Sequence, residues 1–124
     1  MKILIIDDDE EITKMVTKFF KHKGYECSFA NDGKTGVSMI NNQRFDIVLL
    51  DMNMPEFNGY DVLDSLKKNG KIRDQKIIIF SVLPTPDEKL QNLIKDGVHS
   101  SIDKPLQLNE LLKSVQNAYG QERR

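Results

Sequence analysis

The chain has little of several residue types that mark whole classes of protein. It contains no tryptophan, one cysteine and two histidines among its 124 residues. Because Cys27 stands alone, an internal disulfide is excluded, and one cysteine with two distant histidines makes no zinc site. Disulfide frameworks are typical of secreted domains, so this count favours a reducing compartment.

Long apolar runs and an excess of one charge are also missing. A helix that spans a membrane needs about 18 or more apolar residues in a row, and no apolar stretch of this chain approaches that length. The apolar run after Lys2 leads into acidic residues rather than a signal-peptide cleavage site. The formal net charge is −1, although 30% of the residues are charged. We therefore expect a cytoplasmic protein, with neither a membrane nor a nucleic acid as partner of this segment.

Short apolar runs alternate with helical patterns along a chain of 124 residues, the length of one domain. The runs predicted as strands are Lys2–Ile6, Tyr25–Ala30, Ile47–Leu50, Lys76–Phe80 and Val98–Ile102. Strands that alternate with helices predict a parallel sheet covered on both faces and wound right-handed. The predicted fold class is therefore α/β, with a doubly wound parallel sheet.

Helical spacing fills the intervals between these strands. The first stripe consists of Ile12, Met15, Val16, Phe19 and Phe20. These residues recur at the spacing of one helix face, so we expect all of them to face the core. Asp32–Asn42 is the weakest helical segment, because Gly33 and Gly36 lower its helix propensity.

Polar residues predict where the later helices begin. Asn58 is expected to cap the third helix and Thr85 the fourth, with Pro86 at its first helical position. The predicted inward faces of the fourth and fifth helices are Leu90, Leu93 and Ile94, and then Leu108, Leu111, Leu112 and Val115. We expect one domain over residues 1–120, followed by a frayed tail or cut linker over residues 121–124.

Polar side chains follow four of the predicted strands at the point where each strand ends. These residues are Asp7, Asp8, Asp51, Ser81 and Lys104. Parallel sheets bind ligands outside the carboxyl ends of their strands, so all five side chains are predicted to share one edge of the sheet. Singly, each has a structural alternative: a helix or turn cap for an acid, a backbone hydrogen bond for the hydroxyl, a solvated charge for the ammonium. Their joint placement at one edge favours a site.

The chemistry of this edge follows from its charges. Neighbouring carboxylates repel one another, which raises their pKa values unless a cation neutralises them. Mg²⁺ prefers oxygen ligands and binds through one or two carboxylates while keeping waters for substrate oxygens. An ionised aspartate is a competent nucleophile toward phosphorus, and Lys104 and Ser81 would offer a charge and a hydroxyl to a phosphoryl oxygen. Without a dedicated general base, the edge is better suited to accept a phosphoryl group than to turn over a substrate.

Four stretches of the sequence resemble the receiver domain of two-component response regulators, as in chemotaxis regulators. They are KILIIDDDEE at the start, DIVLLDMNMPEFNGYDVL around Asp51, IIIFS ending at Ser81 and SIDKP containing Lys104. The resemblance covers essentially all of residues 1–120. It implies a flavodoxin-like, doubly wound five-stranded parallel sheet with strand order 2-1-3-4-5 and five helices.

The resemblance also implies a role for each residue of the edge. The implied Mg²⁺ ligands are Asp7, Asp8, Asp51 and the backbone carbonyl of Asn53, and no organic cofactor is implied. Asp51 would be the phosphoacceptor, Ser81 the switch hydroxyl and Lys104 the residue that contacts the phosphoryl group. The peptide bond between Lys104 and Pro105 would be cis.

The function implied by the resemblance is a phosphorylation-activated signalling switch. The phosphodonor would be a phosphohistidine on a sensor histidine kinase or a phosphotransfer protein, with small acyl phosphates as substitutes. A downstream protein would bind the fourth helix, fifth strand and fifth helix, and phosphorylation could also drive formation of a homodimer. We expect no enzyme activity beyond the protein's own phosphotransfer and slow autodephosphorylation. The initial Met1 leaves a stand-alone receiver or the input domain of a longer regulator as alternatives.

Two departures from the family pattern concern the switch. The family usually has Tyr or Phe three residues before the Lys, where this chain has Ser101. The aromatic half of the usual switch is therefore in question. The segment Val82–Pro84 is more apolar and stiffer than is common. Leu83 would lie near the mouth of the site, where it could hinder the attacking water and change the lifetime of the phosphoryl group.

Three other classes of protein share part of the pattern. A hydrolase of the haloacid dehalogenase type also uses a nucleophilic Asp. It requires a second Asp two positions later, where this chain has Asn53, and a cap domain, for which the chain has no residues. A flavodoxin-like cofactor binder shares the winding, but Asp7–Glu11 would repel a phosphate after the first strand. A pseudo-receiver usually lacks one of the edge residues, and none is missing here.

Overall fold

Five strands form one parallel sheet at the centre of the computed structural model, which describes residues 1–122. They are β1 (Lys2–Ile6), β2 (Glu26–Ala30), β3 (Ile47–Asp51), β4 (Lys76–Ser81) and β5 (Val98–Asp103). Their order is β2-β1-β3-β4-β5, and each neighbouring pair is parallel. The predicted fold class and strand order are confirmed.

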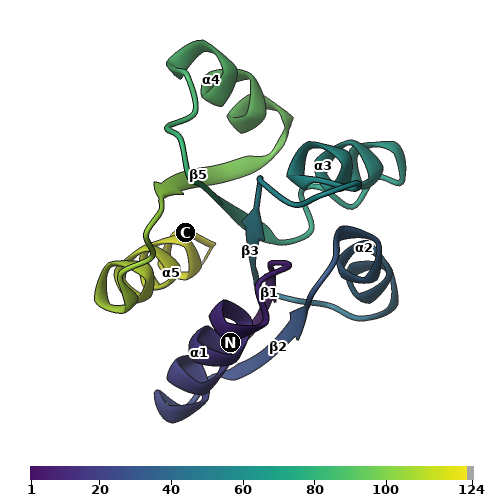
Figure 1. The fold of residues 1–124 in the computed structure, drawn as a ribbon. Helices are drawn as coiled ribbons and strands as arrows, with labels where there is room; N and C mark the ends of the chain where they lie inside the picture. Colours follow the sequence, from purple (N-terminus) through teal and green to yellow (C-terminus); the bar gives the residue numbers. More distant parts are fainter. Residues whose placement is uncertain (123–124) are drawn as a thin grey trace.

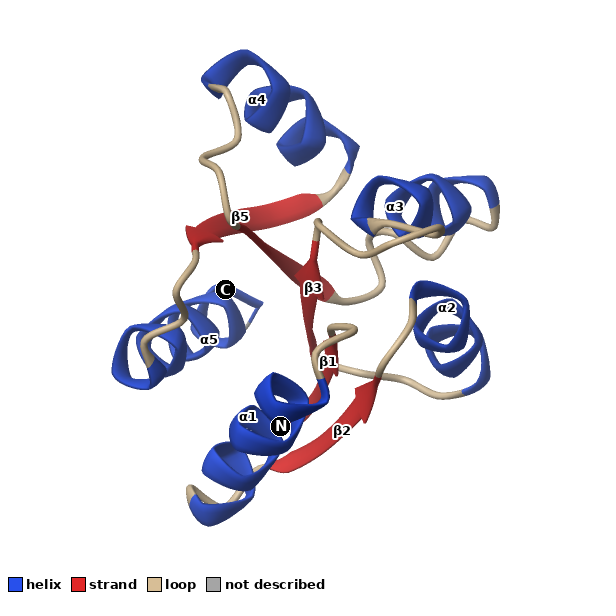
Figure 2. Cartoon of the chain, in the orientation of Figure 1, coloured by secondary structure: helices blue, strands red, loops and turns tan. Residues whose placement is uncertain are grey.

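A helix follows each strand, and the helices are divided between the two faces of the sheet (Figures 1 and 2). They are α1 (Glu10–His22), α2 (Gly33–Asn42), α3 (Gly59–Lys68), α4 (Asp87–Asp96) and α5 (Leu108–Glu122). α1 and α5 cover one face, and α2, α3 and α4 lie on the other. Among residues 1–122, no helix combines the length and the apolar character needed to cross a membrane.

Two hydrophobic clusters hold these layers together, because neighbouring residues of a strand point to opposite faces. Ile3 and Ile5 of β1 pack with α1 and α5, whereas Leu4 and Ile6 pack on the side of α2 and α3. Every residue of β3 is buried, as expected for the central strand of a sheet covered on both faces. The carboxyl end of β3, where Asp51 lies, is therefore anchored from both sides.

The buried face of α1 is turned relative to the predicted stripe. Its buried residues are Thr13, Val16, Thr17 and Phe20, which recur at i, i+3, i+4 and i+7. The prediction that Met15 faces the core is wrong, since its side chain is 42% exposed. The two threonines complete the row that fits against the sheet, and an apolarity pattern does not count them.

The start of α4 also differs from the sequence-based prediction. The prediction of a Thr85 cap is wrong: the helix begins at Asp87, with Pro86 at the N-cap position and no side-chain cap hydrogen bond. The ψ angle of Pro86 is 141°, so the chain is still extended there. Acidic residues in the first turn, Asp87 and Glu88, stabilise this end through the helix dipole instead.

The predicted inward face of α4 is only partly correct. Leu90 and Leu93 are partly buried against the core, but Ile94 is 38% exposed, and no residue of α4 is fully buried. At its carboxyl end, the side chain of Arg73 donates a hydrogen bond to the carbonyl of Lys95. The helix is thus held by the partial packing of two leucines and by a side-chain hydrogen bond at its carboxyl end.

The remaining helix ends agree more closely with the sequence. Asn58 caps α3, and Asp61 completes a capping box by accepting from the Asn58 N–H. Asp32 caps α2 through the N–H of Thr35. α5 continues to Glu122, whereas the sequence predicts a frayed tail over residues 121–124; residues 123 and 124 lie outside the described residues.

Candidate functional site

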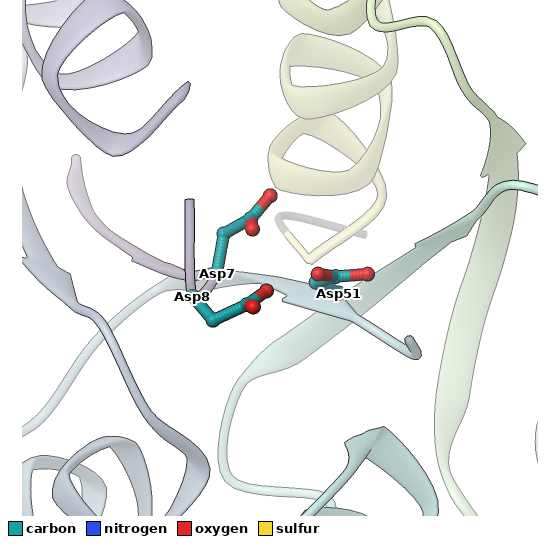
Figure 3. Close-up of side chains that lie close together, drawn as sticks. All are labelled: Asp7, Asp8 and Asp51. Atoms are coloured by element: carbon teal, nitrogen blue, oxygen red, sulfur yellow. The ribbon is translucent and has the colours of Figure 1, made fainter. Parts of the chain in front are cut away.

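Three carboxylates converge at the carboxyl ends of β1 and β3 (Figure 3). Asp7 and Asp8 follow β1 directly, and Asp51 is the last residue of β3. One oxygen of each carboxylate lies within 4.8 Å of one oxygen of the other two. Asp7 and Asp51 are buried and Asp8 is exposed, so the cluster is open to solvent on the Asp8 side.

Two oxygen atoms of this cluster lack the hydrogen bonds that buried polar atoms usually have. Asp7 Oδ2 and Asp51 Oδ2 are buried and accept no hydrogen bond from any described residue. A buried polar atom without a hydrogen bond is costly, so such atoms point to a ligand. A set of hard oxygen ligands in which two buried atoms accept no hydrogen bond fits a small divalent cation such as Mg²⁺.

The loop after β1 separates the roles of its acids. Asp9 caps α1, where its Oδ1 accepts from the N–H of Glu11 at 2.9 Å and of Ile12 at 3.4 Å. The N–H of Asp9 in turn donates to Asp7 Oδ1 at 2.9 Å, which orients the Asp7 carboxylate. Because Asp9 is the cap, the alternative role of Asp8 as a helix cap is excluded.

Lys104 brings a positive charge to the buried pair. Its Nζ lies 3.4 Å from Asp51 Oδ1 and 3.7 Å from Asp7 Oδ2, and its side chain is only 18% exposed. Its main-chain N–H donates to the carbonyl of Ser81 at 2.8 Å. The alternative of a solvated charge is therefore excluded, and the predicted cis peptide bond before Pro105 is confirmed.

The surroundings of Asp7 favour its protonated form in the absence of a cation. Burial, and then repulsion from Asp51, raise the pKa of Asp7 from its ordinary value of 3.8 to about 7. The hydrogen bond from the Asp9 N–H and the charge of Lys104 act in the opposite direction and only partly offset this. The proton on Asp7 is therefore retained to higher pH than on an ordinary aspartate, and a cation would replace it.

Ser81 does not join the carboxylate cluster in this structure. Its side chain is buried at the end of β4, and its hydroxyl donates to the carbonyl of Leu83 in the loop that follows. The backbone hydrogen bond that the sequence left as an alternative is thus the one observed. Ser81 is linked to the cluster through Lys104, because the Ser81 carbonyl accepts a hydrogen bond from the Lys104 main-chain N–H.

Two asparagines take part in the site in ways that the sequence did not reveal. Asn31, which follows β2, donates through Nδ2 to the carbonyl of Asp7 at 3.0 Å and to Thr13 Oγ1 at 3.0 Å. Asn53 donates its main-chain N–H to Asp51 Oδ1 at 2.9 Å. Asn31 could have been suspected from its place after β2 at the same edge, but the sequence has no signal for these bonds.

Comparison with known proteins gives a consistent assignment. Residues 3–116 match the family model of the response regulator receiver domain. Over 118 residues, 93% of this chain, the sequence is 29% identical to the response regulator SaeR of Staphylococcus aureus strain USA300. The match covers 49% of SaeR, so the chain spans about half the length of the curated relatives it matches.

Solved structures agree with this match over nearly the full chain. A Francisella response regulator 1452 receiver domain superposes with a TM-score of 0.85 at 29% identity, covering 98% of each chain. The Vibrio cholerae chemotaxis protein CheY4 gives 0.84 at 27% identity, over 94% of this chain and 97% of its own. A CheY-like receiver domain protein from Methanospirillum hungatei gives 0.87 at 24% identity, covering 98% and 96%, which supports the fold.

Proposed function

Because the chain belongs to the response regulator receiver domain family of two-component systems, we propose that it accepts a phosphoryl group on Asp51 in a Mg²⁺-dependent reaction. The observation that carries this proposal is the buried Asp51 carboxylate. One of its oxygens is held by the Asn53 N–H and faces Lys104, and the other has no hydrogen bond from the described residues. The carboxylate is oriented by the fold and still has lone pairs available.

In the proposed reaction, an Asp51 carboxylate oxygen attacks phosphorus. A new O–P bond forms while the bond between phosphorus and the donor breaks, and the leaving group keeps that bond's electron pair. Lys104, placed 3.4 Å from Asp51 Oδ1, would contact an oxygen of the transferred group. Ser81 would have to exchange the Leu83 carbonyl for a phosphoryl oxygen, a stronger charged acceptor.

The proposed cation ligands are the carboxylates of Asp7, Asp8 and Asp51 and the main-chain carbonyl of Asn53. When bound, Mg²⁺ would supply positive charge that offsets the charge of the phosphoryl oxygens during transfer. The chain's own contribution is to hold two carboxylates in a buried position while Asp8 stays accessible. The raised pKa of Asp7 supports this assignment, since additional positive charge would stabilise its carboxylate.

We propose the specific phosphodonor and downstream partners on the same basis. The phosphodonor is a phosphohistidine of a sensor histidine kinase or a phosphotransfer protein, in the cytoplasm. A downstream protein, or a second copy of the chain after phosphorylation, would bind the region of α4, β5 and α5. The protein would catalyse only its own phosphorylation and slow dephosphorylation, either as a stand-alone receiver or as the input domain of a longer regulator.

Intact-mass measurement tests the proposal. Incubation with Mg²⁺ and a small acyl phosphate should add one acid-stable, base-labile phosphoryl group to the wild-type protein. Asp51→Asn should not gain this mass, whereas Asp64→Asn should gain it normally, because Asp64 is an exposed acid of α3 paired with Lys68. Equal labelling of Asp51→Asn and the wild type would refute the assignment.

A further inference from the structure

Asn53 contacts two different loops at the edge of the sheet. Its main-chain N–H donates to the proposed phosphoacceptor, Asp51, and its main-chain carbonyl is the proposed uncharged cation ligand. Its side chain points elsewhere: Asn53 Oδ1 accepts a hydrogen bond from the main-chain N–H of Val82 at 2.9 Å. One residue therefore joins the carboxylate cluster to the loop between β4 and α4.

That loop has few attachments of its own. Among the described residues, the main-chain bonds that tie its start to other loops are Val82 N–H to Asn53, and Lys104 N–H to the Ser81 carbonyl. The Ser81 hydroxyl donates a hydrogen bond to the Leu83 carbonyl, which lies within the same loop. The side chains of Val82 and Leu83 are 61% and 75% exposed, so packing does little to fix their position.

We infer that the side-chain amide of Asn53 is a positioning group that couples occupancy of the acidic site to the β4–α4 loop. The inference rests on the proposed function, because it takes the Asn53 carbonyl as a cation ligand. A shift of the Asn53 main chain toward a cation, or a change at Asp51, moves the amide oxygen that holds Val82. Coupling between two sites is reciprocal, so the loop position also influences cation affinity.

A second route between site and loop has to be separated from this one. Lys104 contacts Asp51 through its ammonium group and Ser81 through its N–H, so it could pass a change to the residue beside Val82. That route does not use the Asn53 side chain. Substitutions at Asn53 that keep or remove the acceptor oxygen therefore distinguish the two routes.

The matched variants are Asn53→Leu, which removes the acceptor at similar size, and Asn53→Asp, which keeps it. Each is titrated with Mg²⁺ alone and followed by backbone amide NMR. In the wild type, signals of Asp8, Val82 and Leu83 should all shift. In Asn53→Leu, the Asp8 signal should still shift, the Val82 and Leu83 shifts should fall by more than about half, and exchange of the Val82 amide should rise about two- to tenfold. Asn53→Asp should restore the Val82 response at saturating Mg²⁺.

The outcomes separate this inference from the proposed function. A full Val82 response in Asn53→Leu would overturn the inference and favour the Lys104 route. Unchanged exchange of the Val82 amide without Mg²⁺ would also overturn it, because the hydrogen bond would then contribute nothing. The absence of any Mg²⁺-dependent shift at Asp8 in the wild type would instead refute the proposed cation site. Since Asn53 is exposed, these variants should fold, and Asn53→Ala provides a second variant without the acceptor.

Discussion

Replacing Asp7 with asparagine should make the cation-free protein more stable, and the gain should depend on pH. The substitution keeps the shape of the side chain and an oxygen that can accept from the Asp9 N–H. It removes the negative charge of a side chain that is fully buried, with 0% of Asp7 exposed. Ionised Asp7 should therefore lower the free energy of unfolding of the wild type, whereas asparagine carries no charge and should not lower it.

The magnitude follows from the pKa of Asp7, raised from 3.8 to about 7, mainly by burial. Each pKa unit corresponds to about 1.4 kcal/mol, so ionised Asp7 costs the folded state about 4 kcal/mol. The unfolded chain loses this proton near its ordinary pKa and the folded chain only near pH 7. The favourable contribution of protonated Asp7 is thus complete below the unfolded pKa and lost as pH rises through the folded pKa.

Urea unfolding with a chelator, between about pH 5 and pH 8, measures this effect. The free energy of unfolding of Asp7→Asn minus that of the wild type should increase with pH and level off above about pH 7. Adding Mg²⁺ should stabilise the wild type much more than Asp7→Asn, because binding to the folded state adds to its stability. Parallel pH profiles of the two proteins, with Asp64→Asn as a reference, would refute the reasoning.

Two further predictions concern the loops around the site. Gly59→Ala should destabilise the protein by about 1–3 kcal/mol in urea unfolding, because its Cβ would lie 2.7 Å from Met52 Cα and 2.9 Å from the Asp51 carbonyl. Gly120→Ala, whose Cβ meets nothing within 4 Å, should be neutral or stabilising; equal losses would contradict this. A beryllofluoride mimic should shift NMR signals of the β4–α4 loop and α4 more than those of β5. Ser81→Ala should reduce that response while Asp51 is still labelled, and an undiminished response would contradict the role of the hydroxyl.

The convergence of the acids and Lys104 could be predicted because it follows from topology. Apolar runs locate the strands, and parallel winding brings the carboxyl ends of β1, β3 and β5 to one edge whatever the details of packing. Asp7, Asp51 and Lys104 are therefore neighbours in space although they are far apart in sequence. No side-chain rotamer had to be known for that conclusion.

The features that escaped prediction depend on tertiary contacts between loops. The amide of Asn53 meets Val82 only because two loops approach each other, and Asn31 meets Asp7 for the same reason. The start of α4 depends on an extended proline, and the buried row of α1 includes two threonines that an apolar pattern leaves out. Local propensity describes each segment alone and does not contain these contacts.

The burial that makes the site costly also makes it responsive. Asp7 and Asp51 lie at the ends of strands whose residues are almost all buried, so the fold can hold two acids where isolated carboxylates would be unstable. Lys104 compensates only part of their charge, and the pKa of Asp7 remains raised to about 7. The remaining negative charge is relieved by a proton or by a cation. A change of charge at Asp51 would therefore act on a site that is already poorly neutralised. Under the coupling that we infer, its effect would reach the β4–α4 loop through the hydrogen bond between Asn53 and Val82. A packed aromatic ring would not carry it at position 101, where this chain has Ser101.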